Sequence, residues 1–405
     1  MIASLNPSHG RADGLDSPVE GEAIGNQAGL VAAPRRILIL RPDNLGDLVL
    51  FSGALQHIRN HWPSAHITLC VRSFGRELFA HCPHLDELIP YESLRWMAKC
   101  RWPRFLSESK FLRAILQQMC SAALPAANFD LALMPVMAPL ANYHRAMALM
   151  TARSRVGVFG RLENQSDREE RQYRTLYSAQ MDASKWPMDF PEMEANRLFL
   201  QFIGINVNGE DIWPEFWTKP ADVEEAAKLF AGLGAQLVIG IAPGAVSPLG
   251  KRLPPEWYLQ VLQMAGSQNL SFVLLGGKNE IDICRDLELC MRQLDGKNSV
   301  VNLAGKTSVL QLIECMRRCD LLLCPDAAPM HIAAALRKPV LGVMGGGHGA
   351  RFHPWGDPNL ARVVRKTMDC YGCNWNCKYE TFRCIQEITP ADAARELRSL
   401  LKAMH

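Results

Sequence analysis

Short, nearly continuous apolar runs alternate with helical stretches along most of the chain. The first run is Arg36–Leu40, which is followed by a polar turn at 41–47 and a helical stretch at 48–61. Further apolar runs in this half lie at 67–71, 88–91, 129–134 and 155–159. Strands without polar alternation are typical of parallel sheets that helices cover on both faces. The pattern therefore predicts a doubly wound α/β domain in the first half of the chain.

The alternation restarts after residues 182–220, a stretch that is rich in Trp and Pro and has only short periodic runs. We predict strands at 237–242, 272–276, 300–303, 321–324 and 340–344. Helices are predicted at 255–268, 280–294, 309–318 and 329–336. The fold class is thus α/β, with two doubly wound domains that face each other across a cleft. In such domains, ligands bind outside the carboxyl ends of the strands.

These patterns divide the chain into four expected parts. Residues 1–34 are rich in Gly, Ser, Pro and Asp and are expected to form a disordered tail before an N-terminal domain at 35–205. Residues 206–389 form the expected C-terminal domain, which includes a cysteine-rich segment at 370–384. A C-terminal helix is expected within 390–405.

Composition and charge exclude several classes of protein. The chain has 405 residues, of which 48% are hydrophobic, so it can bury large cores. Its 44 Lys and Arg against 41 Asp and Glu leave a net charge of +3, too small for a protein whose main partner is nucleic acid. The longest apolar stretch, 131–150, contains Pro135 and Pro139 as well as polar residues, so no membrane-spanning segment is predicted.

Cysteine usage points to a reducing compartment. The first 34 residues lack the continuous apolar core of a secretory signal. Without export, the 13 cysteines are better explained as reduced thiols with a metal site among them than as a disulfide framework. We therefore expect a cytoplasmic protein.

The turn after the first strand contains two carboxylates, Asp43 and Asp47, just before a helix. Asp and Asn commonly cap helices, so capping is one interpretation of this turn. The alternative is a general base, held at the mouth of a cleft by a tight turn that contains Gly46. The segment alone leaves both interpretations open.

Two loops in the second half follow predicted strands of one sheet and can surround an anion. The first contains Lys251, a mobile positive charge that suits a phosphate, although an exposed loop lysine is an equal alternative. The second runs from Asp326 into a helix with Pro329 in its first turn, which leaves free amides at the helix start. His331 lies one turn inside this helix and is either a packed core histidine or a ligand of that anion.

A third loop, the glycine turn Gly345–Gly349, permits close approach of its backbone to a ligand. A run of glycines is a weak signal by itself, because any sharp turn can use it. Together the three loops predict a cradle for a nucleotide diphosphate. The chain contains neither a GxGxxG fingerprint nor a P-loop, so a dehydrogenase or NTPase is not indicated.

Several motifs, in order along the chain, resemble the ADP-heptose:lipopolysaccharide heptosyltransferases of glycosyltransferase family nine over nearly all of Arg35 to Leu401. The matching segments are 37–49, Lys251 with Pro255-Glu256, 302–307 and 325–335. The resemblance implies a GT-B fold of two Rossmann-like domains, with the ADP-sugar donor bound mainly by the C-terminal domain and the acceptor mainly by the N-terminal domain. It also implies inversion at the anomeric carbon and no catalytic cofactor.

The resemblance further implies roles for individual residues. Asp47 is the general base that takes the proton from the acceptor hydroxyl, with Asp43 in support. Lys251 balances the negative charge on the departing ADP, and Glu280 holds the ribose. The donor pocket is lined by Asp326, the amides of Ala327 and Ala328, His331 and the glycine turn with Gly346. The family usually has Asp-Thr-Gly or Asp-Ser-Gly where this chain has Asp-Ala-Ala, which removes a hydroxyl next to the sugar.

Four cysteines near the C-terminus have the spacing C-x2-C-x3-C-x6-C, namely Cys370, Cys373, Cys377 and Cys384. Four thiolates can surround one zinc or iron ion and leave no open position, which makes a structural clamp. The alternatives are free cysteines, or a zinc-ribbon nucleic-acid module, which lacks its second knuckle here. A similar finger holds iron in a subset related to the autotransporter heptosyltransferases, and spacing does not separate iron from zinc.

The acceptor side has a candidate surface at residues 94–113. This segment contains six Lys and Arg residues and a single Glu, and aromatic residues are interleaved with them. Basic and aromatic residues together suit a phosphorylated glycolipid or an anionic membrane surface. A solvated helix face with inward aromatics is an equal alternative.

The sequence as a whole predicts a cytoplasmic, inverting glycosyltransferase that moves heptose or a similar sugar from ADP-heptose to a lipopolysaccharide-type saccharide. Peripheral contact with the inner membrane is a further expectation, and nucleic acid is not an expected partner. The alternatives are a protein O-heptosyltransferase that acts on serine hydroxyls and a non-catalytic protein that binds a sugar nucleotide or serves as a scaffold.

Overall fold

The computed structural model describes residues 27, 29–91, 128–161, 163–207, 212–233, 237–245, 251–266, 270–294 and 298–404. The described chain divides into two compact units. The N-terminal unit ends at Pro187 but also includes Glu192–Glu215, and the C-terminal unit consists of Phe216–His405 with the short segment Met188–Pro191. Most of the expected tail at 1–34 and the whole basic and aromatic segment at 94–113 lie outside the described residues.

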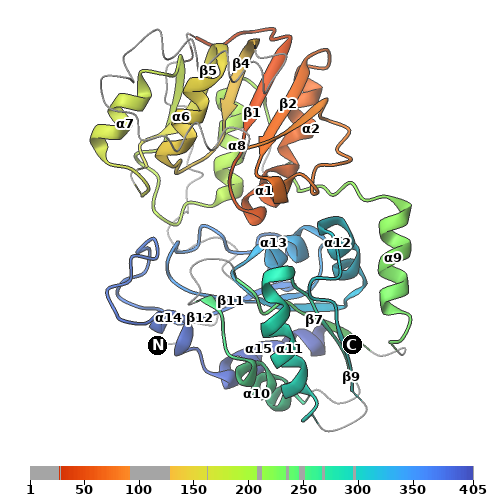
Figure 1. Ribbon diagram of the computed structural model, residues 1–405. Helices are drawn as coiled ribbons and strands as arrows, with labels where there is room; N and C mark the ends of the chain where they lie inside the picture. Colours follow the sequence, from red (N-terminus) through yellow and green to blue (C-terminus); the bar gives the residue numbers. More distant parts are fainter. Residues whose placement is uncertain are drawn as a thin grey trace. The chain divides into compact units, whose positions relative to one another are not determined.

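The N-terminal unit is built on a six-stranded parallel sheet in the order β3-β2-β1-β4-β5-β6 (Figure 1). The strands are β1 Arg36–Leu40, β2 His66–Val71, β3 Glu87–Pro90, β4 Asn128–Met134, β5 Thr151–Phe159 and β6 Ala179–Asp182. Ile37 is paired with Ile67 of β2 on one side and with Leu131 of β4 on the other. The chain moves outward from β1 through β2 and β3 and then returns to the other side, so the strand order reverses between β1 and β4.

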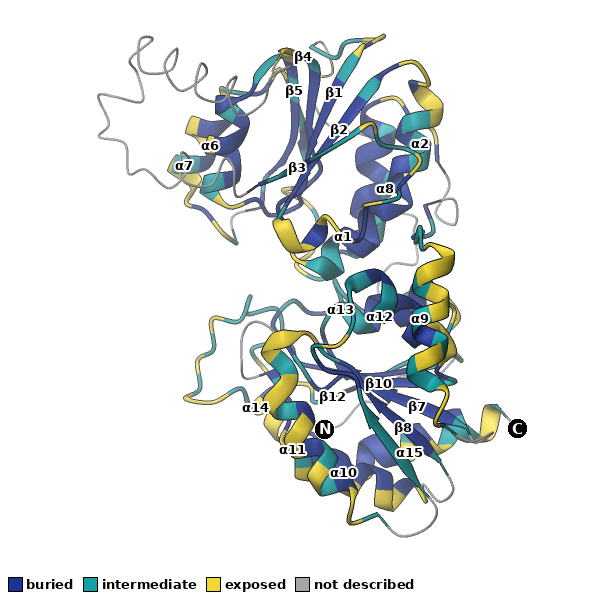
Figure 2. Ribbon diagram, turned by 45° about the vertical axis from the view of Figure 1, so that its right-hand side comes forward, coloured by how far each residue is buried: buried dark blue, intermediate teal, exposed yellow. Residues whose placement is uncertain are grey.

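Helices cover both faces of this sheet and so bury its central strands. They are α1 Leu45–Ser52, α2 Ala54–His61, α6 Ala141–Leu149, α7 Asp167–Arg174 and α8 Glu192–Phe202, with a 3-10 turn η1 at Ser73–Gly75. Ile37, Leu38, Ile39 and Leu40 are fully buried. Figure 2 shows that the helices turn their buried sides to the sheet and their exposed sides outward. Helix α8 lies inside the Trp- and Pro-rich stretch in which the sequence indicated only short periodic runs.

The C-terminal unit repeats the plan with the order β12-β11-β10-β7-β8-β9, again entirely parallel. Its strands are β7 Val238–Ile241, β8 Ser271–Leu274, β9 Ser299–Asn302, β10 Leu321–Pro325, β11 Val340–Met344 and β12 Ala361–Arg365. The order reverses between the neighbours β7 and β10. Ligands of open α/β sheets bind at this kind of reversal, outside the carboxyl ends of the strands.

The helices of the C-terminal unit complete its two faces. They are α9 Pro220–Phe230, α10 Pro255–Ala265, α11 Ile281–Met291, α12 Val309–Arg318, α13 Ala328–Ala335, α14 Arg383–Gln386 and α15 Pro390–Ala403, with a 3-10 turn η3 at Lys278–Glu280. The C-terminal helix α15 packs against α10, and Leu397 and Leu400 join Val261 and Leu262 in the main core of this unit.

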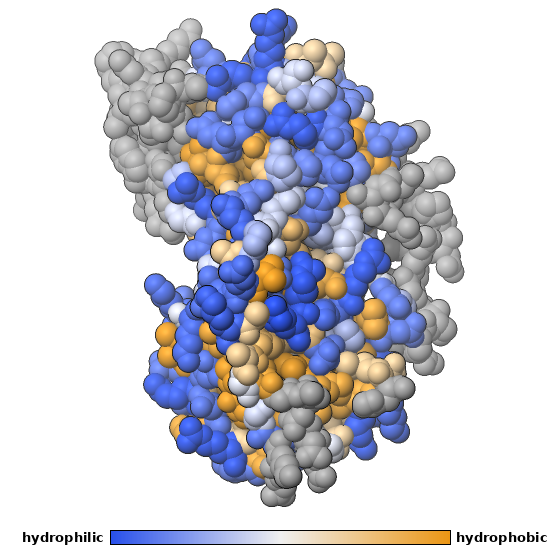
Figure 3. Space-filling model, turned by 90° about the vertical axis from the view of Figure 1, so that its right-hand side faces the viewer, coloured by the Kyte–Doolittle hydropathy of each residue, from blue (hydrophilic) through white to orange (hydrophobic). Residues whose placement is uncertain are grey.

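The predicted fold class, two doubly wound Rossmann-like domains, is confirmed. Within the described ranges, we find no helix with both the length and the apolar composition that crossing a membrane requires. The apolar stretch 131–150 instead forms most of β4 and all of α6. On the face seen in Figure 3, hydrophilic and hydrophobic side chains are mixed over the surface of each unit.

Candidate functional site

The buried guanidinium of Arg41 organises the carboxyl ends of β1 and β4. Arg41 directly follows β1 and is completely buried. Its Nε lies 2.7 Å from Oδ2 of Asp43, and its Nη2 lies 3.2 Å from Oε1 of Glu192 at the start of α8. Nη1 donates to the carbonyl oxygen of Pro135, which follows β4. Arg41 therefore ties the turn that contains the predicted general base to the end of β4, where the strand order of this sheet reverses.

Arg41 stays charged because several carboxylates surround it. Burial by itself lowers the pKa of Arg41, but Asp43, Glu192 and Asp47 outweigh burial and raise the pKa above its ordinary value. A buried charge is tolerated in a protein when it is paired and hydrogen-bonded. The guanidinium also lies over the ring of Phe51, 4.8 Å from the ring centroid. Asp43 thus takes part in a buried ion pair, with 9% of its side chain exposed.

Asp47 sits at the N-terminus of α1 and is half-buried. Its Oδ2 accepts a hydrogen bond of 3.2 Å from the backbone N–H of Asn44, and its carbonyl oxygen accepts one of 3.4 Å from Nη2 of Arg41. The N-terminus of a helix favours a negatively charged side chain. Asp47 therefore caps the helix and also keeps a partly accessible carboxylate at the strand ends.

Lys251 and Asp326 meet at the strand-order reversal of the C-terminal sheet. The Lys251 Nζ lies 2.7 Å from Oδ2 of Asp326, and the two side chains are 8% and 7% exposed. Asp326 directly follows β10, and Lys251 lies in the connection that leaves the neighbouring strand β7. The sequence predicted that these two residues share a site, and the structure brings them into contact.

The environment of Asp326 keeps its carboxylate ionised at neutral pH. Burial by itself raises the pKa of Asp326, but Lys251 lowers it by charge and by its hydrogen bond, and His331 and His348 lower it further. The net pKa lies below the ordinary value of 3.8. The site is therefore a buried ion pair beside two imidazoles, and a bound anion would share the Lys251 ammonium with Asp326.

Helix α13 begins directly beside this pair. Ala327 is its N-cap, and neither Ala327 nor Ala328 has a side chain that can bind the first backbone amides. The first N–H groups of a helix have no partner within the helix and attract anions. His331, one turn further on, is buried, with its ring centroid 6.1 Å from that of Phe352. Asp326, the first residues of α13 and His331 therefore lie together at the end of β10.

Glu280 fills a space that two glycines leave open. A Cβ at Gly244, after β7, would lie 2.2 Å from Glu280, and one at Gly276, after β8, would lie 2.7 Å from it. The Glu280 Oε2 accepts a 2.9 Å hydrogen bond from the N–H of Gly277, and Oε1 lies 3.5 Å from a guanidinium nitrogen of Arg252. Glu280 is thus fixed beside the ends of β7 and β8. Sequence reasoning did not single out Arg252 or Gly244, although both lie in the loop that it marked for Lys251.

The glycine turn after β11 is packed against the cysteine-rich segment. A Cβ at Gly347 would lie 2.3 Å from the indole of Trp375, and one at Gly346 would lie 2.7 Å from the ring of Tyr371. The backbone N–H of Asn374 donates to the carbonyl of Gly347 at 2.7 Å. The sequence attributed these glycines to a close approach of ligand; in the structure Tyr371 and Trp375 lie on the side of Gly346 and Gly347 where a Cβ would point.

Trp375 contacts both the glycine turn and Lys251, which is paired with Asp326. The Lys251 Nζ lies 4.3 Å from the Trp375 ring centroid, and the indole N–H donates to Nδ1 of His348 at 3.1 Å. Burial, with the charges of Lys251 and Arg351, lowers the pKa of His348 to about 4, so its ring is neutral at pH 7 and can accept this bond. Sequence reasoning missed Trp375 and His348. Their positions within the cysteine-rich segment and the glycine turn were the signal that could have found them.

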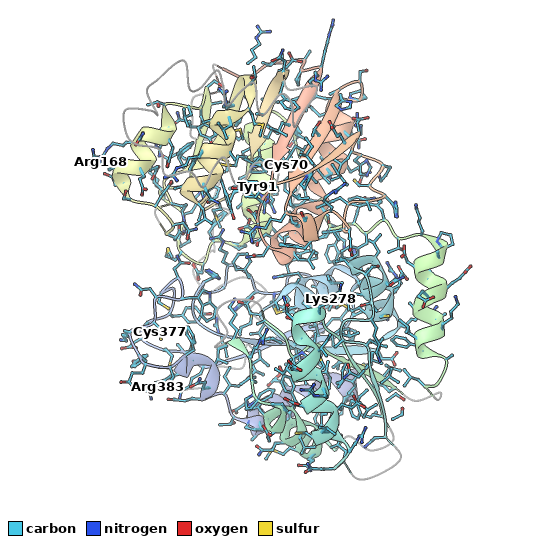
Figure 4. The ribbon with its side chains drawn as sticks, in the orientation of Figure 1. Cys70, Tyr91, Arg168, Lys278, Cys377 and Arg383 are labelled. Carbon is cyan, nitrogen blue, oxygen red and sulfur yellow. The ribbon has the colours of Figure 1, made fainter. Side chains whose placement is uncertain are left out.

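The four predicted metal ligands lie near one another but do not form a metal-binding group. Burial raises the pKa of Cys384, and the thiols of Cys370, Cys373 and Cys377 raise it further, which shows that the four are electrostatic neighbours. Among the described residues, however, no three His, Cys, Asp or Glu side chains are placed so that they could hold a metal ion. Figure 4 shows Cys377 and Arg383 near one edge of the C-terminal unit. The predicted metal finger is therefore not confirmed.

Comparison with known sequences shows similarity to one enzyme family. A family model described as glycosyltransferase family 9 (heptosyltransferase) matches residues 165–380. The chain is 26% identical over 170 residues to lipooligosaccharide heptosyltransferase 2 of Campylobacter jejuni, which covers 42% of this chain and about half, 52%, of that protein. It is 22% identical over 378 residues to lipopolysaccharide heptosyltransferase 2 of Escherichia coli, covering 90% of this chain and 98% of that protein.

Solved structures share the fold at low sequence identity. A glycosyltransferase of family 9 from Veillonella parvula has a TM-score of 0.68 at 17% identity and covers 91% of this chain and 98% of its own. The iron-containing dodecameric heptosyltransferase TibC, solved with ADP-D-beta-D-heptose, has a TM-score of 0.50 at 12% identity and covers 93% of this chain and 78% of its own. At these identities the likeness concerns the fold.

Proposed function

Since the chain belongs to glycosyltransferase family 9 (heptosyltransferase), we propose that it transfers heptose, or a similar sugar, from ADP-heptose to a saccharide acceptor of the lipopolysaccharide type. The observation that carries the proposal is the meeting of Lys251, Asp326 and the amide end of α13 at the strand-order reversal of the C-terminal sheet. A cation, free amides and buried walls suit a sugar diphosphate.

Lys251 balances the charge that develops on ADP as the bond to the sugar breaks. An ammonium about 4 Å from a phosphate oxygen gains about 1 kcal/mol in water and about 4 kcal/mol at an effective dielectric constant near 20. The low exposure of Lys251 supports the larger value. Asp326, the amides of Ala327 and Ala328, His331 and Gly346 line the donor pocket in this proposal, and Glu280 binds the ribose.

Asp47 is the proposed general base. The acceptor oxygen attacks the anomeric carbon from the face opposite ADP, the bond between that carbon and the ADP oxygen breaks, and the hydroxyl proton passes to the Asp47 carboxylate. The configuration inverts, and all atoms are accounted for without a metal ion. Partial exposure and a place at the end of β1 support this role, and the buried ion pair of Asp43 with Arg41 supports a holding role for Asp43.

The cysteines Cys370, Cys373, Cys377 and Cys384 are proposed to hold one iron or zinc ion. Soft thiolate sulfurs suit both metals. Burial and then the neighbouring thiols raise the pKa of Cys370 and of Cys384, which indicates that the four cysteines lie close together, although in the described part of the chain they are not arranged as a metal-binding group. Four protein ligands leave no open position, so the ion would brace the finger and supply no chemistry to the transfer. The iron of TibC favours iron.

The acceptor and the place of action are also part of the proposal. The basic and aromatic segment 94–113 is proposed to bind the phosphorylated glycolipid and to touch the anionic inner membrane from the cytoplasm. Among the described residues the cysteines are not joined in disulfides, which is consistent with this reducing compartment. Replacing Arg101 and Arg104 by Gln is expected to weaken use of the acceptor and to leave ADP affinity unchanged; equal loss of both would reject this assignment.

The decisive experiment measures ADP release and product mass with ADP-heptose and three acceptor conditions: a truncated lipopolysaccharide core, a protein rich in exposed serine, and no acceptor. Release with the saccharide acceptor and a product heavier by one heptose support the proposal. Transfer to the protein alone favours the protein O-heptosyltransferase, and binding of ADP-heptose without transfer to either acceptor indicates a non-catalytic protein.

A matched pair of variants isolates the role of Asp47. Asp47→Asn is expected to lower turnover at least about 100-fold, because loss of a general base typically costs that much or more, with ADP affinity unchanged. Asp222 forms the same kind of helix cap, accepting from the backbone N–H of Lys219 at 2.9 Å in the C-terminal unit. Asp222→Asn is therefore the control and should retain turnover. Near-normal turnover of Asp47→Asn would leave Asp47 with the capping role alone.

A further inference from the structure

Trp375 lies at the junction between the cysteine finger, defined here as residues 370–384, and the Lys251–Asp326 pair. One face of its indole carries the Lys251 ammonium, 4.3 Å from the ring centroid. The indole N–H donates to His348 of the glycine turn, and the ring also packs against Phe382 with centroids 5.8 Å apart. A single side chain thus connects the finger, the glycine turn and the cation of the proposed donor pocket.

The backbone at Trp375 has an uncommon conformation that aims the ring at the pocket. Among the described residues, three that are not glycine have a positive φ: Arg337, Asn374 and Trp375, the last two at +48° and +61°. Residues with a Cβ adopt this region at a cost, and such strain often marks a functional position. Here two such residues follow each other between Cys373 and Cys377. The finger holds Trp375 in place against this cost.

The glycine turn is shaped to receive the indole. A Cβ at Gly345 would lie 2.8 Å from the ring of Trp375, and a Cβ at Gly347 would lie 2.3 Å from it. A Cβ at either position would displace the ring, so both glycines allow Trp375 to stay in contact with Lys251. The hydrogen bond from the indole N–H to His348 fixes the orientation of the ring. The same ring face is therefore always presented to the Lys251 ammonium.

Lysine needs such support to act as a specific anion ligand. Its four-carbon stem is flexible, and a binding group that is restricted before the ligand arrives loses less entropy on binding. Attraction between an ammonium and a ring face is strongest for indole and grows when the contact is shielded from water. Both conditions hold at Trp375.

We propose that Trp375 is a positioning residue of the donor site, whose indole holds the Lys251 ammonium where it meets the diphosphate of the sugar nucleotide. The inference rests on the proposed function, because the ligand that Lys251 meets is the ADP moiety of that reaction. It makes the finger part of the donor site through an indole contact, independently of whether the cysteines hold a metal.

Calorimetric titration with ADP tests the proposal in the full-length protein. Trp375→Leu is expected to raise the Kd for ADP about five- to twentyfold, the range that a shielded cation–π contact implies. Trp375→Phe keeps a ring face and should lose less. Tyr379→Leu is the matched control, because Tyr379 lies on the same finger and its ring faces Lys378 and Arg383 instead; its Kd should equal that of the unchanged protein. Metal content, measured on each variant, identifies any that has lost the finger, and Trp375→Phe then decides.

A double-mutant cycle separates positioning of Lys251 from a general structural role. In a Lys251→Met background, Trp375→Leu should change the Kd for ADP less than twofold, because the group on which the ring acts is gone. The same fold-loss in both backgrounds, or an unchanged Kd in Trp375→Leu alone, would overturn the inference while ADP binding by the unchanged protein still supports the proposed function. Absence of ADP binding in the unchanged protein would overturn both.

Discussion

The Lys251 ammonium and the Asp326 carboxylate lie 2.7 Å apart in the interior of the C-terminal unit, although 75 positions separate them in the sequence. Two adjacent parallel strands, β7 and β10, bring them together at the point where the strand order reverses. A buried pair of this kind costs much to break from one side, since the remaining charge has no partner. Lys251 of this pair is the cation that the proposed reaction uses.

This pair has separate effects on stability and on binding. Lys251→Met is expected to destabilise the protein by about 3–5 kcal/mol, because Asp326 is then a buried carboxylate without its ammonium. Adding Asp326→Asn should recover much of that stability, since the buried charge is removed, but not ADP affinity or turnover. Urea unfolding and calorimetry with ADP measure the two effects.

The control for this prediction is Lys228→Met, which breaks an exposed pair with Glu225. It should leave both unfolding and ADP affinity unchanged, because exposed pairs contribute little. Recovery of turnover in the double variant would show that Lys251 does not act on the donor.

Arg41→Met should destabilise the N-terminal unit by about 3–5 kcal/mol, because Asp43 and Glu192 lose the guanidinium that compensates their burial. Arg41→Lys should recover little, since an ammonium cannot match the several directions in which the guanidinium donates. The urea midpoint measures both, and Arg171→Met, which breaks an exposed helical pair with Asp167, is the control. A midpoint for Arg41→Lys equal to that of the unchanged protein would contradict this account of the turn.

Acid is expected to destabilise the fold through His144. This residue is fully buried, stacked on Tyr173, and its Nδ1 is hydrogen-bonded to the Tyr177 hydroxyl at 2.9 Å. Burial lowers the pKa of His144 from 6.5 to about 4, against a smaller opposing effect of Gln165. The unfolded state therefore binds the proton first, so stability that is present above pH 6.5 is lost as the pH falls towards 4, by up to about 3 kcal/mol.

The pH effect can be assigned with two variants. His144→Phe should flatten the dependence of the urea midpoint on pH between 6.5 and 4, because the titrating ring is gone and an aromatic stack remains. Phe202→Leu, at a buried residue without a titrating group, should lower the midpoint but leave its dependence on pH as it is. An unchanged slope in His144→Phe would assign the acid sensitivity to other groups.

Gly347→Ala should detach the finger from the glycine turn, because the new methyl group would lie 2.3 Å from the Trp375 indole. The expected results are a loss of about 1–3 kcal/mol in stability, as for other overpacked sites, and weaker ADP binding. At Gly232 a Cβ meets nothing within 4 Å, so Gly232→Ala is the matched control and should be neutral. Equal behaviour of the two variants would show that the packing of Trp375 on the turn is not maintained in solution.

Metal analysis of the purified protein should give one iron or zinc ion per chain. Cys377→Ser should abolish metal binding, because a hydroxyl is a poor replacement for a thiolate ligand. Cys290→Ser, at a cysteine in α11 that is distant from the finger in sequence, should retain the metal. Protein with full ADP affinity and no metal in either form would remove the ion from the proposal.

Much of the fold follows from local pattern. Central strands are buried on both faces, so their residues are continuously apolar, and β1, β2, β4, β10 and β11 were predicted within a few residues of their bounds. The strands β6 and β12 were missed. Both lie at sheet edges, and β6, Ala-Gln-Met-Asp, alternates buried with partly buried residues and so lacks the apolar run. Helix α8 was missed because Trp and Pro residues on both sides of it led the stretch to be interpreted as a connection between domains.

The sequence by itself determined the order of most strands along the chain, the place of the Asp47 turn and of Asp326 after strands, and the cysteine spacing, because each depends on residues close together in the chain. The tertiary structure alone decided that Glu192 pairs with Arg41, 151 positions away, that Glu280 occupies the space over Gly244, and that Trp375 fills the glycine turn and reaches Lys251. These contacts arise where parallel strands end side by side, and no local pattern specifies which side chains then meet.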